Sequence, residues 1–324
     1  MHNTTNTVFP IRLTKTIKRP YKLIEWKLGN TCNYDCSFCD DSNKTGNEQW
    51  LDFETYVSVC DQFMASTDDK IFFQFTGGEP TLYPRLDELV SNIKSKGHYV
   101  SLFSNGSRTI RWWKDFAENN LLDCLNLTVH VEQSANIDHL IAVINLFKTS
   151  STHVYVQCTA TLEYFDETLL AFNRIKKETS SILNLKSITN TKGLIDYNQS
   201  QLAILKSNSV ILSDKFYEKP HSSEMTYYTS MILEYSDGTR REHKPHTMVA
   251  TNNNKFFGWK CSVGINYINI MYDKIYKAMC KQDGVISTVY DTNLSFTSEY
   301  TVCLKSQCLC PTDLLEDKYN PMQF

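Results

Sequence analysis

The sequence predicts an α/β fold in which a parallel sheet curls into a partial (β/α)6 barrel. Between residues 22 and 190, short strand-like runs alternate with helix-like runs. Parallel strands need crossover connections, which are usually helices, so this alternation indicates repeated βαβ units. The spacing of the runs fits an open barrel of six strands better than a closed barrel of eight.

Each predicted element is bounded by a change of hydrophobic periodicity. Asp52 precedes the first helix-like run and has a side chain suited to cap its N-terminus. We predict strands at 22–29, 70–76, 98–104, 123–130, 152–160 and 183–189, and helices at 52–64, 84–96, 109–119, 137–148 and 166–178.

Apolar and polar residues alternate within the predicted strands. In the first strand, Ile24, Trp26 and Leu28 share one face, whereas Glu25 and Lys27 share the other. Parallel strands covered on both faces usually read as continuous apolar runs. We therefore predict that the apolar face packs on the helices and that the polar face lines an interior that holds ligand and water.

The pattern weakens after residue 190, and this change suggests the domain organisation. Residues 191–225 are polar and irregular, and a hairpin is predicted at 226–236 and 239–250 through the turn Asp237-Gly238. We expect an N-terminal extension at 1–20, the barrel at 21–190, a linker or specificity insert at 191–250 and a cysteine-containing domain at 251–324.

Composition excludes several classes of function. The 324 residues include 33 basic and 36 acidic side chains, which gives a net charge of −3 and no sign of the basic footprint of a nucleic-acid-binding protein. No apolar run of about 18 residues indicates a membrane span, and residues 1–10 lack the apolar core of a signal peptide. We therefore expect a cytoplasmic protein, in which clustered cysteines serve metal binding or catalysis.

Three cysteines, Cys32, Cys36 and Cys39, directly follow the first predicted strand. Ligands of parallel α/β folds bind at this end of the strands. Three thiolates in a short loop can hold three corners of a cubane iron–sulfur cluster and leave the fourth iron open. Zinc is the alternative, but structural zinc normally takes four ligands, and no fourth Cys or His lies close by in the sequence.

This Cx3Cx2C spacing, with Phe38 before the last cysteine, resembles the signature of the radical S-adenosylmethionine (SAM) superfamily. The resemblance implies a [4Fe–4S] cluster whose open iron chelates SAM. Reductive cleavage of SAM then gives a 5′-deoxyadenosyl radical that takes a hydrogen atom from the substrate. It also implies a reducing partner such as flavodoxin or ferredoxin. No side chain is assigned as a catalytic residue, because the radical arises at the cluster.

Further polar residues end the later strands in the same order as in that superfamily. Gly77, Gly78 and Glu79 are similar to its GGE motif, which binds the SAM ammonium group, and glycines allow the close approach of a backbone. A plain turn is the alternative. The resemblance also implies ligand contacts for the polar residues at the ends of the third, fourth and fifth strands, namely Ser104, Asn105, His130, Glu132 and Gln157.

A second group of cysteines lies in the last quarter of the chain. Its Cys-x2-Gly opening and the second cysteine about twenty residues later resemble the SPASM/twitch extension of the superfamily, which carries auxiliary clusters. Five cysteines suit one auxiliary [4Fe–4S] cluster with one thiol to spare, and a zinc site built from the last four is the alternative. The five cysteines are Cys261, Cys280, Cys303, Cys308 and Cys310.

These observations lead to a radical SAM enzyme that abstracts hydrogen from a small-molecule or sugar-like substrate, causing oxidation or rearrangement. The alternative is an enzyme that modifies a peptide or protein side chain. An RNA-modifying enzyme is disfavoured by the acidic balance, and a zinc-stabilised binding module is the alternative without catalysis.

Overall fold

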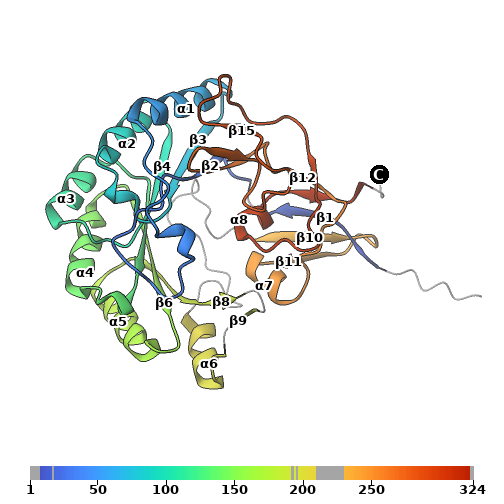
Figure 1. Cartoon of the computed structure of the whole chain (residues 1–324). Helices are drawn as coiled ribbons and strands as arrows, with labels where there is room; N and C mark the ends of the chain where they lie inside the picture. The colour runs from blue at the N-terminus through green and yellow to red at the C-terminus, as the bar shows by residue number, and fades with distance from the viewer. Residues whose placement is uncertain (1–7, 17, 191–192, 195, 209–229, 322–324) are drawn as a thin grey trace, which may run out of the picture.

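The structure is a computed structural model that describes residues 8–16, 18–190, 193–194, 196–208 and 230–321. Its larger sheet has nine strands, and its central strands are joined by helices as predicted (Figure 1). In spatial order the strands are β15 (Ser287–Thr288), β14 (Lys274–Tyr276), β13 (Tyr267–Met271), β2 (Tyr21–Lys27), β3 (Lys70–Thr76), β4 (Tyr99–Ser104), β5 (Cys124–Val129), β6 (His153–Ala160) and β7 (Ile182–Ser187).

Five helices cover the convex side of this sheet, which curls into an arc (Figure 1). They are α1 (Phe53–Ala65), α2 (Leu86–Ser95), α3 (Ile110–Glu118), α4 (Ile137–Leu146) and α5 (Phe165–Glu178). The backbone N–H of Thr55 donates to the Asp52 carboxylate at 2.8 Å, so Asp52 caps α1 as predicted. The pairs from β2 to β7 are all parallel. The α/β partial barrel predicted from the sequence is therefore confirmed.

The alternating strand pattern sorts the side chains as predicted on the convex side. Ile24, Trp26 and Leu28 are fully buried in the main core with residues of the helices. The concave side differs from the prediction near the N-terminal ends of its strands. There Tyr21, Phe72 and other side chains form a second apolar cluster with Cys261 and Val263. Part of the concave face is therefore buried in an apolar contact with the C-terminal segment of the chain and is not lined by polar groups.

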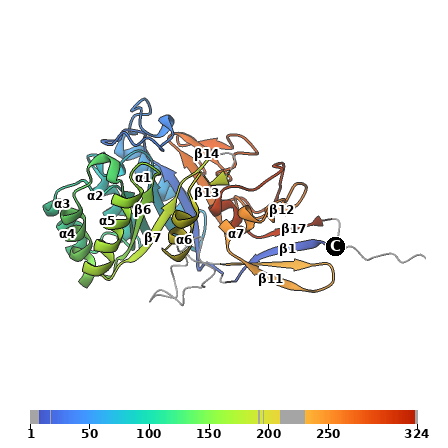
Figure 2. The ribbon, with the colours of Figure 1, turned by 90° about the horizontal axis from the view of Figure 1, so that it is seen from below.

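A second sheet of six short strands lies beside the barrel (Figure 2). It joins both ends of the chain, since β1 from the N-terminal region pairs with β10 and with β17 near the C-terminus. In spatial order the strands are β11 (Arg240–His243), β10 (Met231–Tyr235), β1 (Pro10–Lys15), β17 (Lys318–Tyr319), β12 (Lys260–Cys261) and β16 (Thr301–Val302).

The segment after residue 190 corrects two details of the sequence prediction. The predicted irregular stretch contains helix α6 (Gln199–Asn208), which Asn198 caps by accepting the N–H of Gln201 at 2.9 Å. The hairpin forms at Asp237-Gly238, but its second strand ends at His243, because Pro245 begins helix α7 (Pro245–Ala250). Residues 209–229, including the start of the predicted hairpin, lie outside the described residues.

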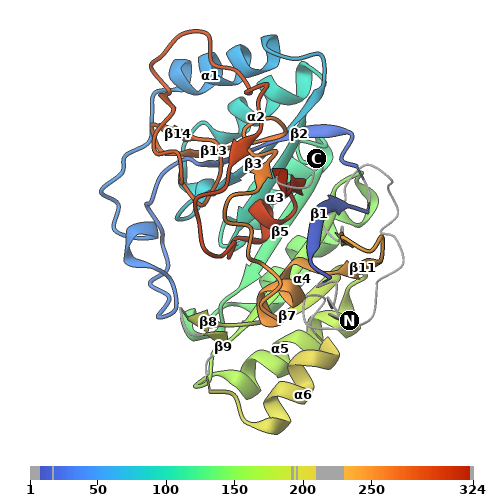
Figure 3. The same ribbon diagram turned by 90° about the vertical axis from the view of Figure 1, so that its right-hand side faces the viewer.

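The structure also contains the short strands β8 (Thr189–Asn190) and β9 (Gly193–Leu194) and helix α8 (Pro311–Leu314). β13 adds a further parallel strand to the free edge of β2, so that residues 251–324 contribute to both sheets. Figure 3 shows β13 and β14 beside β2 and β3. No helix among the described residues is long and apolar enough to cross a membrane.

Replacement of Phe73 by alanine should test the main core. Its side chain is fully buried on β3, so the cavity left by Phe73→Ala should lower the free energy of unfolding by about 3–5 kcal/mol. Leu170 on α5 is 70% exposed and provides the control, for which we expect a change within about 0.5 kcal/mol. Urea unfolding followed by circular dichroism measures both; equal losses in the two variants would contradict this core.

Candidate functional site

The cysteine loop begins where the backbones of β2 and β3 end side by side. The N–H of Gly78 donates to the carbonyl of Gly29 at 3.0 Å, and the N–H of Glu79 donates to the carbonyl of Thr31 at 2.9 Å. These bonds continue the pairing of the two strands beyond their ends. The residue before Cys32 is therefore held by backbone bonds that do not depend on a ligand.

The two glycines permit this approach because they lack a β-carbon. A Cβ on Gly78 would lie 2.3 Å from the carbonyl oxygen of Thr31, and a Cβ on Gly77 would lie 2.3 Å from that of Gly29. Gly77 also has a φ of +137°, which other residues rarely adopt. The close backbone approach expected from the motif is therefore an approach to Gly29 and Thr31, the residues that lead into the cysteine loop.

Glu79 is almost fully buried and joins the ends of β3 and β4. Its Oε1 accepts hydrogen bonds from the hydroxyls of Thr81 at 2.6 Å and Ser104 at 2.8 Å, and from the N–H of Thr81 at 3.1 Å. Its Oε2 accepts the N–H of Asn105 at 2.7 Å. Burial raises the pKa of Glu79, and these bonds oppose that rise. The carboxylate therefore orders the neighbouring strand ends, whichever further group it contacts.

Two residues after β5 hold the cysteine loop from the opposite side. Glu132 accepts the N–H of Ser37 at 2.7 Å and its hydroxyl at 2.8 Å. His130 stacks on Phe38, with ring centroids 5.3 Å apart. Burial lowers the pKa of His130 to about 4, so its ring is neutral near pH 7. Both were predicted as ligand contacts, and the structure places both against residues of the loop.

Several residues that no sequence motif indicates complete this clamp. Gln133 exchanges two hydrogen bonds with the backbone of Asp35, each 3.1 Å long. The amide of Asn105 donates to Asn33 at 2.9 Å, and Asn33 in turn donates to Ser107 at 2.9 Å. These partners are about 70 to 100 positions apart in the chain, so no local pattern could have identified them.

The three thiols of the loop are close enough to influence one another electrostatically. Burial is the main cause that raises the pKa of each, and for Cys36, where the value is about 12, the nearby charges of Glu132, Cys32 and Cys39 add to it. The thiols are therefore protonated near pH 7 and must lose protons when a metal binds. All three are free cysteines.

Within the described ranges, no three His, Cys, Asp or Glu side chains converge as ligands of a single metal ion. Each thiolate of a cubane cluster binds a different iron, so its ligands need not converge on one point. The loop offers three thiols, of which Cys36 is buried, whereas structural zinc normally takes four ligands.

Gln157 is a predicted cofactor-binding residue that no described contact brings to the cysteine loop. It lies on β6 in register with Thr128 of β5 and Asn184 of β7. Its side chain makes no hydrogen bond to any residue that the structure describes. Its predicted role in binding a cofactor stays a prediction.

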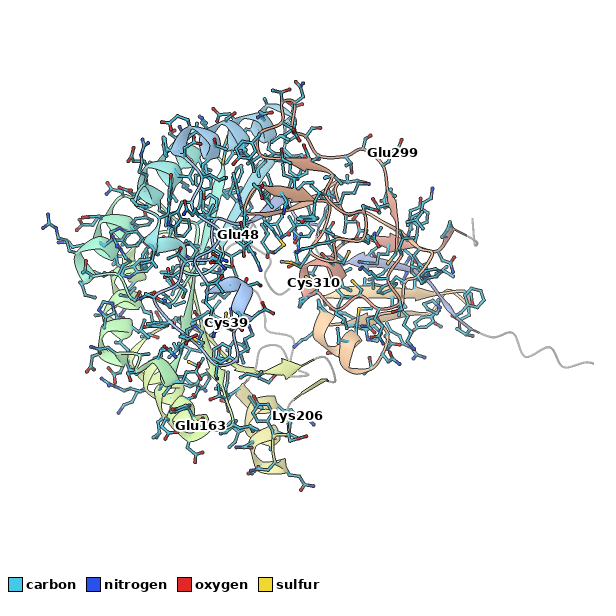
Figure 4. All side chains as sticks on the ribbon, viewed as in Figure 1. Cys39, Glu48, Glu163, Lys206, Glu299 and Cys310 are labelled. Carbon is cyan, nitrogen blue, oxygen red and sulfur yellow. The ribbon has the colours of Figure 1, made fainter. Side chains whose placement is uncertain are left out.

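Four of the five C-terminal cysteines share charged neighbours around α8. The backbone N–H of Cys280 donates to the carboxylate of Asp313 at 2.8 Å. The charge of Asp313 also contributes to the raised pKa values of Cys280, Cys308 and Cys310, although burial is the main cause for each. Cys261 pairs with Lys318 across β12 and β17. Figure 4 labels Cys310 beside α8 and Cys39 in the loop after β2.

Lys318 supplies a buried positive charge to this group. Its ammonium donates to the carbonyls of Asp313 at 2.5 Å and Glu316 at 2.8 Å. It lowers the pKa of Cys261 and Cys308, in opposition to the larger effect of burial. Cys303 differs from the other four in that its thiol donates to the carbonyl of Lys305 at 3.7 Å, although it shares the apolar cluster of the second sheet with Cys308.

Residues 26–157 match the family model described as the radical SAM superfamily. They contain the cysteine loop, the double-glycine turn and most of the barrel. This part of the chain is therefore similar to the radical SAM superfamily. Proteins of this superfamily use a [4Fe–4S] cluster and SAM, and a structural neighbour was solved with bound S-adenosylmethionine.

Curated relatives match over about a third of the chain. The probable GTP 3′,8-cyclase of Pyrobaculum aerophilum is 30% identical over 114 residues, which cover 35% of this chain and 36% of that protein. The S-adenosylmethionine-dependent nucleotide dehydratase of a Thermoplasmatales archaeon is 30% identical over 118 residues, which cover 35% of this chain and 40% of that protein. The chain thus spans well under half the length of the curated relatives it matches.

Solved structures resemble the fold over most of its length. The structure titled native anSMEcpe with bound AdoMet has a TM-score of 0.52 and 17% identity, and covers 85% of this chain and 79% of that one. Streptococcus suis SuiB bound to its precursor peptide SuiA has a TM-score of 0.54 and 12% identity, and covers 86% of this chain and 64% of SuiB. At these identities the likeness concerns the fold alone.

Replacement of Gly78 by alanine should disturb the root of the cysteine loop. The new Cβ would overlap the backbone of Thr31, so Gly78→Ala should lower the free energy of unfolding by about 1–3 kcal/mol. It should also reduce the iron bound after reconstitution, measured by a colorimetric iron assay.

The control is Gly238→Ala in the hairpin turn, where no atom lies within 4 Å of the new Cβ and only the φ of +81° opposes it. That control should retain full iron binding. Wild-type iron content in Gly78→Ala would show that the close approach of the two backbones is dispensable.

Proposed function

We propose that this chain is a radical SAM enzyme that binds a [4Fe–4S] cluster through Cys32, Cys36 and Cys39. The single observation that carries the proposal is the clamped loop, in which one buried thiol, Cys36, and two partly buried thiols are held between the ends of β2, β3 and β5. When bound, the cluster and SAM supply an electron and a 5′-deoxyadenosyl radical that takes a hydrogen atom from the substrate.

The chain's own residues act by positioning and by exclusion of water. Glu132 accepts the N–H of Ser37, and the carbonyl of Cys36 accepts a hydrogen bond from Lys44 at 3.0 Å. These bonds fix the backbone of the loop at Cys36 and Ser37. We propose that Gly77, Gly78 and Glu79 form the edge against which SAM binds. Ser104 and Asn105 then support Glu79, and His130 presents a neutral ring beside Phe38.

For the substrate we propose a small polar molecule, and a nucleotide or a sugar-like compound in particular. The names of two relatives at 30% identity refer to GTP and to nucleotides. The polar side chains on the concave face, described below, favour the same class. A peptide substrate is the alternative, and SuiB, which has a similar fold, was solved with its precursor peptide.

We further propose that Cys261, Cys280, Cys308 and Cys310 bind an auxiliary [4Fe–4S] cluster, and that Cys303 is the spare thiol. The charge of Asp313 acts on all four thiols and that of Lys318 acts on Cys261 and Cys308, whereas the Cys303 thiol donates to the carbonyl of Lys305. Such a cluster can receive the electron that remains when a substrate is oxidised, and its potential depends on nearby charge and hydrogen bonds. A flavodoxin or ferredoxin would supply electrons to the first cluster.

The Cys36→Ala variant should lose SAM cleavage, because it removes one of three thiolate ligands of the cluster. After anaerobic reconstitution and reduction with dithionite, 5′-deoxyadenosine measured by liquid chromatography should fall to the level of a protein-free sample. Cys60→Ala is the matched control, since Cys60 is buried in α1 away from the loop, and it should keep the activity. Cleavage that persists in Cys36→Ala contradicts the assignment.

Iron content should distinguish one cluster from two. Reconstituted wild-type protein should bind about eight irons, four for each cubane cluster. Cys280→Ala should lower the count towards about four, whereas Cys303→Ala should leave it near eight. A wild-type count near four, with the first cluster visible by electron paramagnetic resonance, would remove the auxiliary cluster from the proposal.

A further inference from the structure

Two buried polar side chains lie next to each other on the concave face of the large sheet. Glu25 of β2 and Asn269 of β13 are aligned partners in the parallel pairing of these strands. Ile24 and Ile268, which precede them in the two strands, belong to the main core on the convex side, so Glu25 and Asn269 face the concave side. Glu25 lies on the strand face that the sequence predicts to line the interior, whereas no sequence pattern indicates Asn269.

Asn269 has the hydrogen-bonding capacity of a full amide, and its polar neighbour is the Tyr267 hydroxyl. The side chain is completely buried, and neither its Nδ2 nor its Oδ1 has a hydrogen-bond partner. A buried amide without partners costs free energy, so native structures usually satisfy it with protein, water or ligand. An amide of this kind on the inner face of a barrel indicates a group that binds beside it.

Glu25 is a buried carboxyl group without an ion-pair partner. It is 8% exposed, and no lysine or arginine of the described chain lies within ion-pair distance of it. The groups that face it are Lys27 on its own strand, Tyr267 on β13, Thr312 and Asp313 on α8, and the thiol of Cys310 just before α8. Burial raises the pKa of Glu25 to about 7. Retention of such a group without a charged partner is typical of a functional site.

The neighbouring strand extends this polar surface. Gln74 of β3 is the aligned partner of Glu25 on its other side, and Ser101 of β4 is the aligned partner of Gln74. All four side chains are buried and polar. The apolar cluster that contains Tyr21, Phe72 and Tyr267 lies on the same face, near the N-terminal ends of the strands. These four side chains form a polar row, which is bordered by the apolar cluster on the side of the strand N-termini.

This row also lies between the two cysteine groups. β2 leads from Glu25 to Cys32 within seven positions, whereas Thr312 and Asp313, which face Glu25, follow Cys310. A molecule bound to Glu25 and Asn269 would therefore have the cysteine loop at one side and α8 at the other.

We infer that Glu25 and Asn269 form a substrate-binding pair that recognises adjacent hydroxyl groups of a sugar or of the ribose of a nucleotide. A carboxylate accepts hydrogen bonds from sugar hydroxyls, as it does for ribose in dinucleotide-binding folds. The amide adds one acceptor and two donor hydrogens beside it. The inference rests on the proposed function for the reaction, but the binding of hydroxyl groups is tested separately.

The test uses iron-reconstituted full-length protein with SAM and measures affinity by isothermal titration calorimetry. One arm uses the four ribonucleoside triphosphates and their 2′,3′-dideoxy counterparts. The other arm uses glucose and 2-deoxyglucose. We expect at least one hydroxylated probe to bind, and its deoxy counterpart to bind about ten-fold or more weakly, because the buried polar groups then stay unpaired.

Two variants locate the effect. Glu25→Gln and Asn269→Leu should each weaken the hydroxylated probe about ten-fold and reduce the difference from its deoxy counterpart. Thr168→Val is the matched control, because Thr168 on α5 is also fully buried with an unpartnered hydroxyl but lies among the helices, so the affinity should stay unchanged. Wild-type iron content and SAM affinity in all variants show that they fold.

Three results would overturn the inference: no binding of any hydroxylated probe to the wild type, equal binding of hydroxylated and deoxy probes, or wild-type affinity in both variants. Binding that follows the expected pattern in a protein that forms no 5′-deoxyadenosine would support the hydroxyl site and contradict the proposed reaction. The two proposals can therefore fail independently.

Discussion

The backbone contact between the ends of β2 and β3 is the constraint on which the functional end of the barrel depends. Two hydrogen bonds, from Gly78 to Gly29 and from Glu79 to Thr31, continue the strand pairing into the loops. They require two residues without β-carbons, since a Cβ at either glycine would meet a carbonyl oxygen at 2.3 Å. They also bring the Glu79 carboxylate to the end of β4, where it accepts bonds from Ser104 and Asn105. One local geometry thus organises three strand ends.

Around this contact, polar residues that resemble ligand-binding groups also hold the protein together. Glu132 and Gln133 bind the backbone of the cysteine loop, and Asn105 reaches it through Asn33. Such a clamp lets the loop keep its shape while its thiols, which burial keeps protonated, exchange protons for metal. The loop is therefore pre-organised by the barrel, which reduces the ordering that metal binding must produce.

The C-terminal segment contributes strands to both sheets. Its residue Glu316 belongs to a buried network of charged groups. Glu316 is fully buried and forms ion pairs with Lys15 at 3.4 Å and Arg19 at 3.0 Å, both from the N-terminal region. Its other oxygen accepts the hydroxyl of Ser262 at 2.9 Å. Loss of one partner from such a network leaves a buried charge uncompensated, which is strongly destabilising. The network links the two ends of the chain beside the cysteines of α8.

The sequence by itself determined the barrel, because periodicity and turn residues are local properties. The strands β2 to β7, the cap at Asp52, the cysteine loop and the glycine turn all follow from neighbouring residues. The tertiary structure decided what depends on distant partners. It added β13 to the edge of β2, made Glu132 a clamp for Ser37, and placed Asn269 beside Glu25. Residues some 100 to 240 positions apart meet there, and a pattern read along the chain carries no record of which strands become neighbours in space.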